Sequence, residues 1–151
     1  MALELLLFEI DHTACGVATS HVREVFRAVA VERLPEYPAF VEGGLNLHSE
    51  IIPVVDGRAI LSRAPKMLEP SDHFILLEAD QQLVAVHVDR AHELSILEKY
   101  CDNAVSQAGK LVKQVVNTHR GSTAILDVQQ LIRASRPIAS SLSSGVVSND
   151  S

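Results

Sequence analysis

The chain consists of two related halves, and this internal repeat limits the possible folds more than any other feature of the sequence. When the sequence is shifted against itself by about 69 residues, LLLFEID at 5–11 falls on FILLEAD at 74–80. At a shift of about 71 residues, His48 meets His119 and Asp56 meets Asp127. Amphipathic strands also resemble one another by composition, so chance similarity is the alternative. Duplication explains the ordered matches better and predicts one small unit formed twice.

Short apolar runs around polar turns predict that each half is built from β-hairpins. Two such runs flank the turn at 48–50, and the runs 73–80 and 83–89 form another pair. Aromatic residues make up only 4%, so the core must consist of Leu, Ile and Val, whose branched members favour strands. Closure into a barrel would remove the exposed strand edges of each unit of about 60 residues. We therefore predict a mostly β fold of two small barrels packed together, with short helices and a docking crevice between the barrels.

Three local patterns complete this expectation. Residues 22–27 (VREVFR) are predicted to form a short helix with Val22, Val25 and Phe26 on one face, and this segment is either a recognition edge or a solvated helix face. Residues 29–38 are predicted to form a strand that ends at two prolines. Short helices are predicted after Asp56 and Asp127, with each aspartate as the N-cap.

We expect one domain at 1–136, made of two subdomains at approximately 1–65 and 72–134 between which strands can be exchanged. The segment 98–110 has no clear period and is predicted to be a loop with a helical turn. The tail at 137–151 is serine-rich and poor in apolar residues, so it is predicted to be disordered.

Charge and composition exclude several classes of function. The net charge of -6 provides no basic stripe for phosphates, so nucleic acid is an unexpected partner. The start MALELLLFEID contains three acidic residues and no Lys or Arg, and no later segment reaches the roughly 20 apolar residues of a membrane span. We therefore expect a cytoplasmic protein without direct membrane insertion. Cys15 and Cys101 lack ligand spacing and are interpreted as reduced thiols, with Cys15 buried on a strand.

The sequence predicts no catalytic residue, no cofactor and no metal site. Its seven histidines are scattered, with none in an HxxxH or HExxH frame, and no nucleophile elbow or Gly-rich phosphate loop is present. Most histidines are interpreted as exposed polar positions, and His87 is expected on the opposite strand face from Val86 and Val88. A paired-carboxylate site at Asp56 and Asp127 is the alternative to helix capping, which is the favoured interpretation.

The segments HVREVFR at 21–27 and LPEYPAFVEGGLNLHSEIIPVVDGRAIL at 34–61 resemble the signature region of the CheW family of chemotaxis adaptors, and the resemblance extends from Leu3 to Arg133. Nine residues match the family pattern in order: Val41, Gly43, Asn46, Leu47, Ile52, Pro53, Val54, Asp56 and Arg58.

This resemblance implies a pair of five-stranded SH3-like barrels and a scaffold without enzymatic activity. Such a scaffold bridges the cytoplasmic tip of a methyl-accepting chemoreceptor to the regulatory domain of a CheA-type histidine kinase. By position, the resemblance implies that seven residues contribute to protein binding: Val22, Glu24, Val25, Gly43, Asn46, His48 and Arg58.

The sequence departs from the family pattern at three positions. His48 and Ser49 stand where the family has Arg and Gly, and Gly57 stands where it has Leu. Histidine lacks the permanent planar charge of arginine, so partner choice can differ, and Ser49 suggests a changed turn.

Two alternatives to the adaptor therefore stay open. One is a CheW-like protein that binds or sequesters a single partner in a related motility or second-messenger pathway. The other is a small-ligand-binding or hydrolytic β-barrel protein that uses Asp56, Asp127 and His48.

Overall fold

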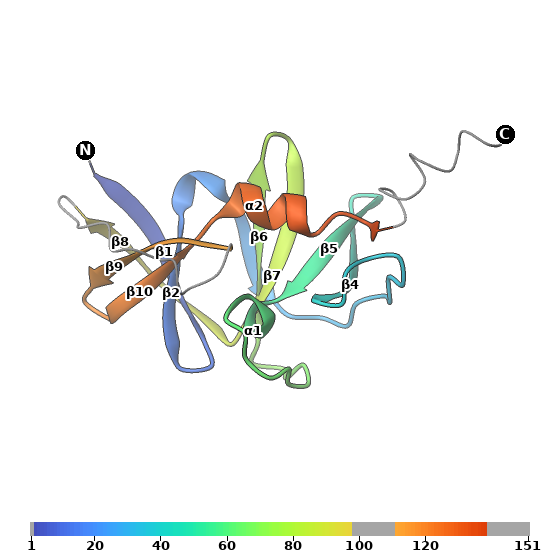
Figure 1. The fold of residues 1–151 in the computed structure, drawn as a ribbon, viewed down its shortest axis with the longest axis horizontal. Coiled ribbons are helices and arrows are strands. Elements are labelled where there is room, and N and C mark those ends of the chain that lie inside the picture. Colours follow the sequence, from blue (N-terminus) through green and yellow to red (C-terminus); the bar gives the residue numbers. More distant parts are fainter. Residues whose placement is uncertain (1, 98–110, 139–151) are drawn as a thin grey trace, which may run out of the picture.

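The computed structural model describes residues 2–97 and 111–138. Two five-stranded sheets lie side by side along the long axis of the molecule, with two short helices, α1 (Gly57–Ile60) and α2 (Val128–Ala134), near the middle (Figure 1). The prediction of a mostly β fold with two five-stranded units and short helices is confirmed. In the described residues, no helix is long and apolar enough to cross a membrane.

The sheet nearer the N-terminus, sheet A, has the strand order β8-β1-β2-β10-β9. Its strands are β1 (Leu3–Ile10), β2 (Thr13–Ala18), β8 (Arg90–Leu97), β9 (Val112–Thr118) and β10 (Gly121–Leu126). Neighbouring strands are antiparallel except for β2 and β10, which are parallel.

The second sheet, sheet B, has the strand order β3-β6-β7-β5-β4. Its strands are β3 (Val22–Arg27), β4 (Val41–Leu47), β5 (Glu50–Asp56), β6 (His73–Ala79) and β7 (Gln82–Val88). Here β5 and β7 are the parallel pair. Sheet B therefore repeats the pairing pattern of sheet A, with β6 and β7 in the places of β1 and β2.

Each sheet takes strands from both halves of the chain. Sheet A combines the first hairpin, β1 and β2, with β8, β9 and β10 from the second half. Sheet B combines the hairpin β6 and β7 from the second half with β3, β4 and β5 from the first. A short 3-10 helix, η1 (Thr19–His21), carries the chain from β2 in one sheet to β3 in the other. The two sheets are therefore interlocked by the course of the chain.

One hydrophobic core continues across both sheets. Ile10 and Val17 of sheet A belong to the same buried cluster as Val55 and Val86 of sheet B, and Leu131 of α2 completes it. Two smaller clusters fill the individual sheets, one around Phe74 in sheet B and one around Leu5 and Leu7 in sheet A. Burial of this shared apolar surface is the main force that holds the sheets together.

Two local predictions are wrong. Residues 22–27 form the edge strand β3 rather than a helix, because their backbone pairs with the buried strand β6 and their β-branched residues suit a strand. Residues 29–38 form no strand beyond a single bridge between Glu32 and Gly44. Proline has no backbone N–H to donate, so a segment with two prolines cannot continue the ladder.

Three hairpins turn through two residues that both have positive φ. These residue pairs are Asp11 and His12, His48 and Ser49, and Asp80 and Gln81. Positive φ at both positions defines a type I′ turn, whose twist matches that of the flanking strands. The predictions for 98–110, Cys101 and the tail beyond residue 138 lie outside the described residues.

Candidate functional site

Three of the seven expected contact residues lie on the edge strand β3. Its inner neighbour is β6, with Val25 opposite Ile75, and no described strand pairs with its outer side. Glu24 is exposed, Val25 is 37% exposed and Val22 is half-buried. An edge strand with unpaired backbone groups and an exposed apolar side chain can accept a partner segment.

The β4–β5 hairpin holds Gly43, Asn46 and His48, but only two of these are accessible. Asn46 and His48 are exposed, whereas Gly43 is buried. A Cβ at Gly43 would lie 2.3 Å from the backbone oxygen of Glu32, so glycine is needed for close backbone approach. Backbone hydrogen bonds between Glu32 and Gly44, of 3.0 and 2.6 Å, cover the outer edge of β4 at this point. The hairpin can therefore offer its turn to a partner more readily than its edge.

Ser49 was expected to change the turn of this hairpin. The turn has φ values of 52° at His48 and 69° at Ser49, which is the geometry that glycine favours. Serine therefore occupies a left-handed position in a two-residue turn.

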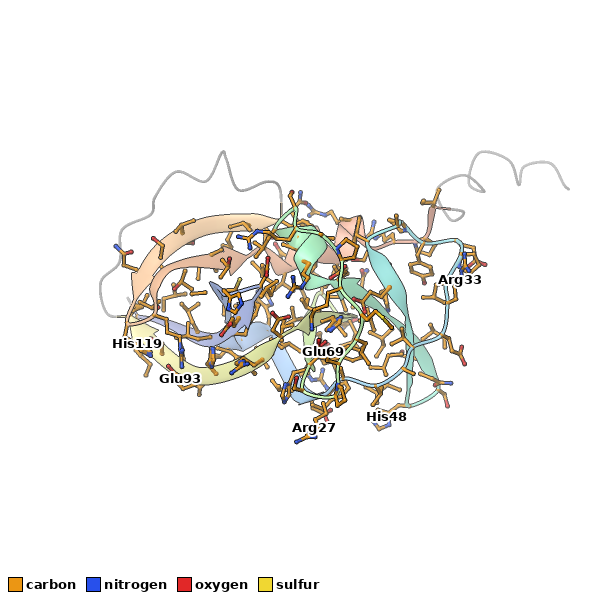
Figure 2. All side chains as sticks on the ribbon, turned by 90° about the horizontal axis from the view of Figure 1, so that it is seen from below. Arg27, Arg33, His48, Glu69, Glu93 and His119 are labelled. Atoms are coloured by element: carbon orange, nitrogen blue, oxygen red, sulfur yellow. The ribbon has the colours of Figure 1, made fainter. Side chains whose placement is uncertain are left out.

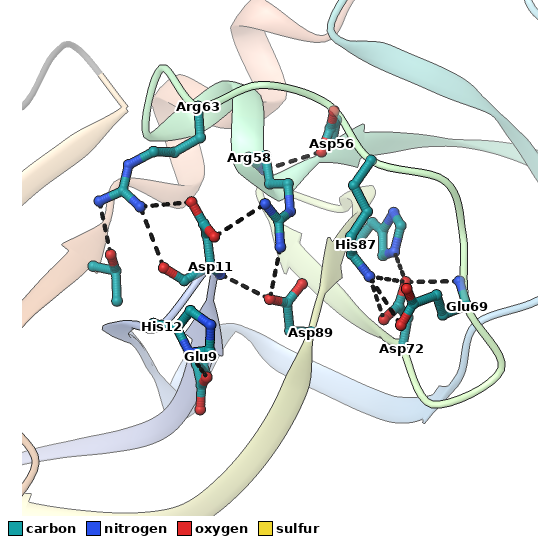
Figure 3. A network of polar contacts seen from close by, with 12 residues as sticks. Glu9, Asp11, His12, Asp56, Arg58, Arg63, Glu69, Asp72, His87 and Asp89 are labelled. Carbon is teal, nitrogen blue, oxygen red and sulfur yellow. Dashed lines mark hydrogen bonds and ion pairs between the residues drawn. The ribbon is translucent and has the colours of Figure 1, made fainter.

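Arg58 lies in an ion-pair network between the sheets rather than on an open surface. Its guanidinium lies 3.1 Å from Asp11 on the β1–β2 turn and 3.1 Å from Asp89, which lies between β7 and β8. Arg63 reaches the other oxygen of Asp11 at 2.8 Å (Figure 3). The hydrogen bond from Arg63 is the main cause that lowers the pKa of Asp11, and the charge of Arg58 adds to it. Arg58 therefore ties the two sheets together.

The expected contact residues consequently occupy three places: the β3 edge, the β4–β5 hairpin and the inter-sheet network. The strands β3 and β4 are at opposite ends of the order of sheet B, yet Phe26 of one and Leu47 of the other pack on the same apolar cluster. Arg27 and His48 point toward the same side of the view in Figure 2. The first two places therefore lie on one side of the molecule in this view, while Arg58 lies apart from them in the network between the sheets.

His87 is buried, so the interpretation of most histidines as exposed polar positions does not hold for it. It is only 6% exposed because β7 is the central strand of sheet B and both of its faces are covered. The ring Nδ1 lies 2.6 Å from Glu42 and Nε2 lies 2.7 Å from Asp72. Burial opposes a charge on the ring, but the hydrogen bonds to Glu42 and Asp72 outweigh it and raise the pKa of His87.

Sequence reasoning missed the acidic neighbours of this histidine, which include Asp56 besides Glu42 and Asp72. Potential ligand atoms of Glu42, Asp56 and His87 lie within 4.8 Å of one another, a spacing that could hold a metal ion. The three residues come from three strands, so no sequence spacing could have indicated the group. Burial, followed by the charge of Glu42, raises the pKa of Asp56. Because both ring nitrogens of His87 already have carboxylate partners, the arrangement is accounted for as an ion pair.

The capping predictions are confirmed. Asp56 accepts a hydrogen bond from the backbone N–H of Arg58 at 3.0 Å, and Asp127 accepts one from Gln130 at 3.1 Å. The prediction that Cys15 is buried is also confirmed, since it is fully buried and burial raises the pKa of its thiol to about 12. Such a thiol is a poor nucleophile at neutral pH.

A cavity of about 540 Å³ lies between the two helices. The residues that line it include Leu111, Ile60 of α1 and Arg133 of α2. None of the seven expected contact residues lines this cavity, although Arg58 lies on the same helix as Ile60.

Comparison with known proteins gives consistent matches. The family described as CheW-like domain matches residues 4–136. The chemotaxis protein CheW of Thermotoga maritima is 30% identical over 132 residues, which cover 85% of this chain and 87% of that protein. The protein of the same name from Treponema pallidum is 29% identical over 91 residues, which cover 58% of this chain and 54% of that protein.

Among solved structures, the scaffolding protein TtCheW of Thermoanaerobacter tengcongensis has the same fold, with a TM-score of 0.74 and 24% identity. The match covers 84% of this chain and 90% of that one. The chemotaxis protein CheW of Klebsiella aerogenes also matches. For this protein and the Treponema protein, the matched part spans only about half of the relative's length.

Proposed function

Because the chain belongs to the CheW-like domain family, we propose that it is a non-enzymatic adaptor in chemotaxis-like signal transduction. In this role it couples the cytoplasmic tip of a methyl-accepting chemoreceptor to the regulatory domain of a CheA-type histidine kinase, and it works in the cytoplasm. The observation that carries the proposal is the extent of the family match, residues 4–136, which includes the ten described strands apart from Leu3 at the start of β1.

The edges of the two sheets support a role with two partners. Val25 on β3 and Leu94 on β8 are related by the repeat, and both are exposed, at 37% and 57%. Both strands are sheet edges, and both contain an irregularity in their pairing with the neighbouring strand. Glu93 of β8 lies far from Arg27 of β3 in Figure 2, toward one end of the molecule. Two separate edges of the same construction allow one chain to hold two proteins at once.

Copurification with both partners tests this proposal. The purified chain, used as bait in a lysate of its source, should retain a chemoreceptor and a histidine kinase together, identified by mass spectrometry. Recovery of one partner alone would favour the single-partner protein. Recovery of neither by a folded bait would contradict the adaptor.

The replacement of the family arginine by His48 is what favours the single-partner alternative. If that replacement has weakened receptor docking, His48→Arg should increase receptor affinity while kinase affinity stays constant. Because His48 is exposed on a turn, the substitution should leave the fold intact. An unchanged receptor affinity would show that position 48 does not decide between the two roles.

A ligand-binding or hydrolytic role has weaker support. Asp56 lies with Glu42 and His87, whereas Asp127 lines a hollow with Leu3 and Lys113. Each of the two aspartates already caps a helix. The candidate groups for catalysis therefore face different surroundings.

A further inference from the structure

His87 joins two segments that are distant in the sequence. Through Nδ1 it contacts Glu42 on β4, and through Nε2 it contacts Asp72 at the end of the connector 61–72. Its ring also packs edge-to-face on Phe74, with 5.7 Å between the ring centres. Figure 3 shows His87 beside Asp72 and Glu69, on the side of the polar network away from Arg63.

The hydrogen-bond partners define the charge of the ring. Ionised carboxylates only accept hydrogen bonds, and a neutral imidazole can donate from one nitrogen alone. Asp72 also accepts from Nζ of Lys66, at 3.1 Å, and from the backbone N–H of Glu69, at 3.0 Å, so it acts as an ionised acceptor. Two carboxylates that both accept from the ring require both ring nitrogens of His87 to donate, which is the imidazolium form.

The two residues whose carboxylates hold this ring are each connected to one of the candidate docking segments. Glu42 precedes Gly43 on β4, in the strand that leads to the turn at His48. The backbone oxygen of Asp72 accepts from the N–H of Ala28 at 2.9 Å, immediately after β3. One buried ring thus anchors the end of β3 and the start of β4 to the centre of sheet B.

We propose that His87 is a positioning residue, and that its proton holds the β3 edge and the β4–β5 hairpin in the arrangement that binds partners. Partner binding should then weaken as the pH rises and the ring loses this proton. The inference rests on the proposed adaptor function, since it assigns pH control to the surface of sheet B that the adaptor would use.

The surrounding charges determine the direction of this effect. Carboxylates outnumber cations around the ring, so a neutral ring would leave Glu42 and Asp56 close together without a cation between them. The charged and titratable groups that face the ring or the groups around it come from β4, β5, α1, the connector and the residue after β7: Glu42, Asp56, Arg58, Lys66, Glu69, Asp72 and Asp89.

The pKa of His87 is raised in the folded chain above the ordinary value of 6.5. The charged His87 ring therefore stabilises the folded state fully below pH 6.5. This contribution is lost as the pH rises through the pKa that His87 has in the folded chain.

Nuclear magnetic resonance of the full chain with ¹⁵N-labelled histidine tests the charge. Both ring nitrogens of His87 should keep imidazolium shifts at a pH where histidine in the urea-unfolded chain is already neutral. The variant Glu42→Gln should lower the titration midpoint of His87, while the control Glu50→Gln, at an exposed position of β5, should leave it unchanged. A ring that titrates at the same pH in the folded and unfolded chains would overturn the proposal.

Hydrogen exchange, corrected for the intrinsic effect of pH, tests the positioning role without any partner. Once His87 is neutral, protection should fall by about tenfold or more at the amides of Ala28, Glu69 and Asp72, and stay constant at Phe8 and Cys15 in sheet A. Unchanged protection at the first three amides would overturn the positioning role.

Binding of a receptor tip fragment and a kinase regulatory domain should weaken over the same pH range, and Glu42→Gln should shift that range down with the midpoint of His87. If the affinity for these partners does not change as His87 titrates, the proposal that His87 controls docking is overturned. Absence of binding at every pH would instead count against the adaptor, while the resonance and exchange results still decide the role of His87.

Discussion

Gly57 stands where the backbone of α1 passes closest to β7. A Cβ at this position would lie 2.3 Å from the backbone oxygen of His87 and 2.8 Å from a methyl carbon of Ile10. At the equivalent point of the second half, Val128 is buried in the shared core. At the start of α1 the backbone itself packs against the neighbouring strand, whereas at the start of α2 the side chain of Val128 fills the corresponding space. In this chain, position 57 therefore leaves no room for a side chain.

Gly57→Ala should consequently destabilise the protein by about 1–3 kcal/mol, because a backbone oxygen cannot move aside as a side chain can. Urea denaturation measures this free energy of unfolding. Gly16→Ala is the matched control, since the nearest atom to its new Cβ would be a methyl carbon of Ile125 at 3.2 Å. Equal effects of the two substitutions would show that the contact at Gly57 is not limiting.

Ser49 is a second residue whose backbone geometry favours glycine. Its φ of 69° is unfavourable for a residue with a Cβ, and its exposed side chain leaves room for the change. Ser49→Gly should therefore stabilise the fold by about 0.5–1 kcal/mol, as measured by thermal unfolding. Ser71→Gly, at an exposed position without positive φ, should be neutral or destabilising. A loss of stability in Ser49→Gly would contradict this account of the turn.

At the scale of elements, β3 is the segment on which the expected docking surface most depends. A charge on its exposed face should weaken a contact with an apolar partner while the fold is retained, because Val25 is 37% exposed. Val25→Glu should therefore unfold cooperatively and bind its partner at least about tenfold more weakly, as measured by calorimetry.

Gln82→Glu provides the control for charge alone, since it adds the same charge at an exposed position of β7. Leu94→Glu on the repeat-related strand β8 should affect the other partner instead. If Val25→Glu fails to fold, Val25 belongs to the core; if it binds normally, the β3 edge is not a docking surface.

The sequence predicted elements well where local signals and long-range packing agree. The hairpins around 48–50 and 73–89 and the caps at Asp56 and Asp127 depend on turn residues and short apolar runs, and all are present. The helical pattern at 22–27 was overridden by pairing with β6, which lies about 50 residues further along the chain. Local patterns cannot show such a pairing.

The candidate site was less predictable for the same reason. The ion pair between His87 and Glu42 joins residues separated by 45 positions. The other partner, Asp72, lies in a connector that has no periodic pattern. The inward position of Arg58 depends on how the two sheets meet, which no segment of the sequence specifies.

At the scale of the whole molecule, the exchange of strands follows from the length of one connection. Within sheet A, β2 and β8 are parallel, because both are antiparallel to β1. For the first half to form its own barrel, β3 would have to take the place of β8, and the chain would have to return along the full length of β2. That length is about 20 Å for a six-residue strand, whereas the three residues of η1 span at most about 11 Å. The chain must therefore continue into the second sheet.

The two halves should accordingly be unable to fold apart. A fragment of residues 1–71 holds two strands of sheet A and three of sheet B, and it exposes its share of the common core. Expressed alone, this fragment and the fragment 72–151 should give poorly dispersed amide spectra, whereas an equimolar mixture should recover the spectrum of the intact chain. A monomeric fragment with a dispersed spectrum would show that a half can close on itself. The argument from η1 would then fail, because it requires each barrel to be completed by strands from the other half.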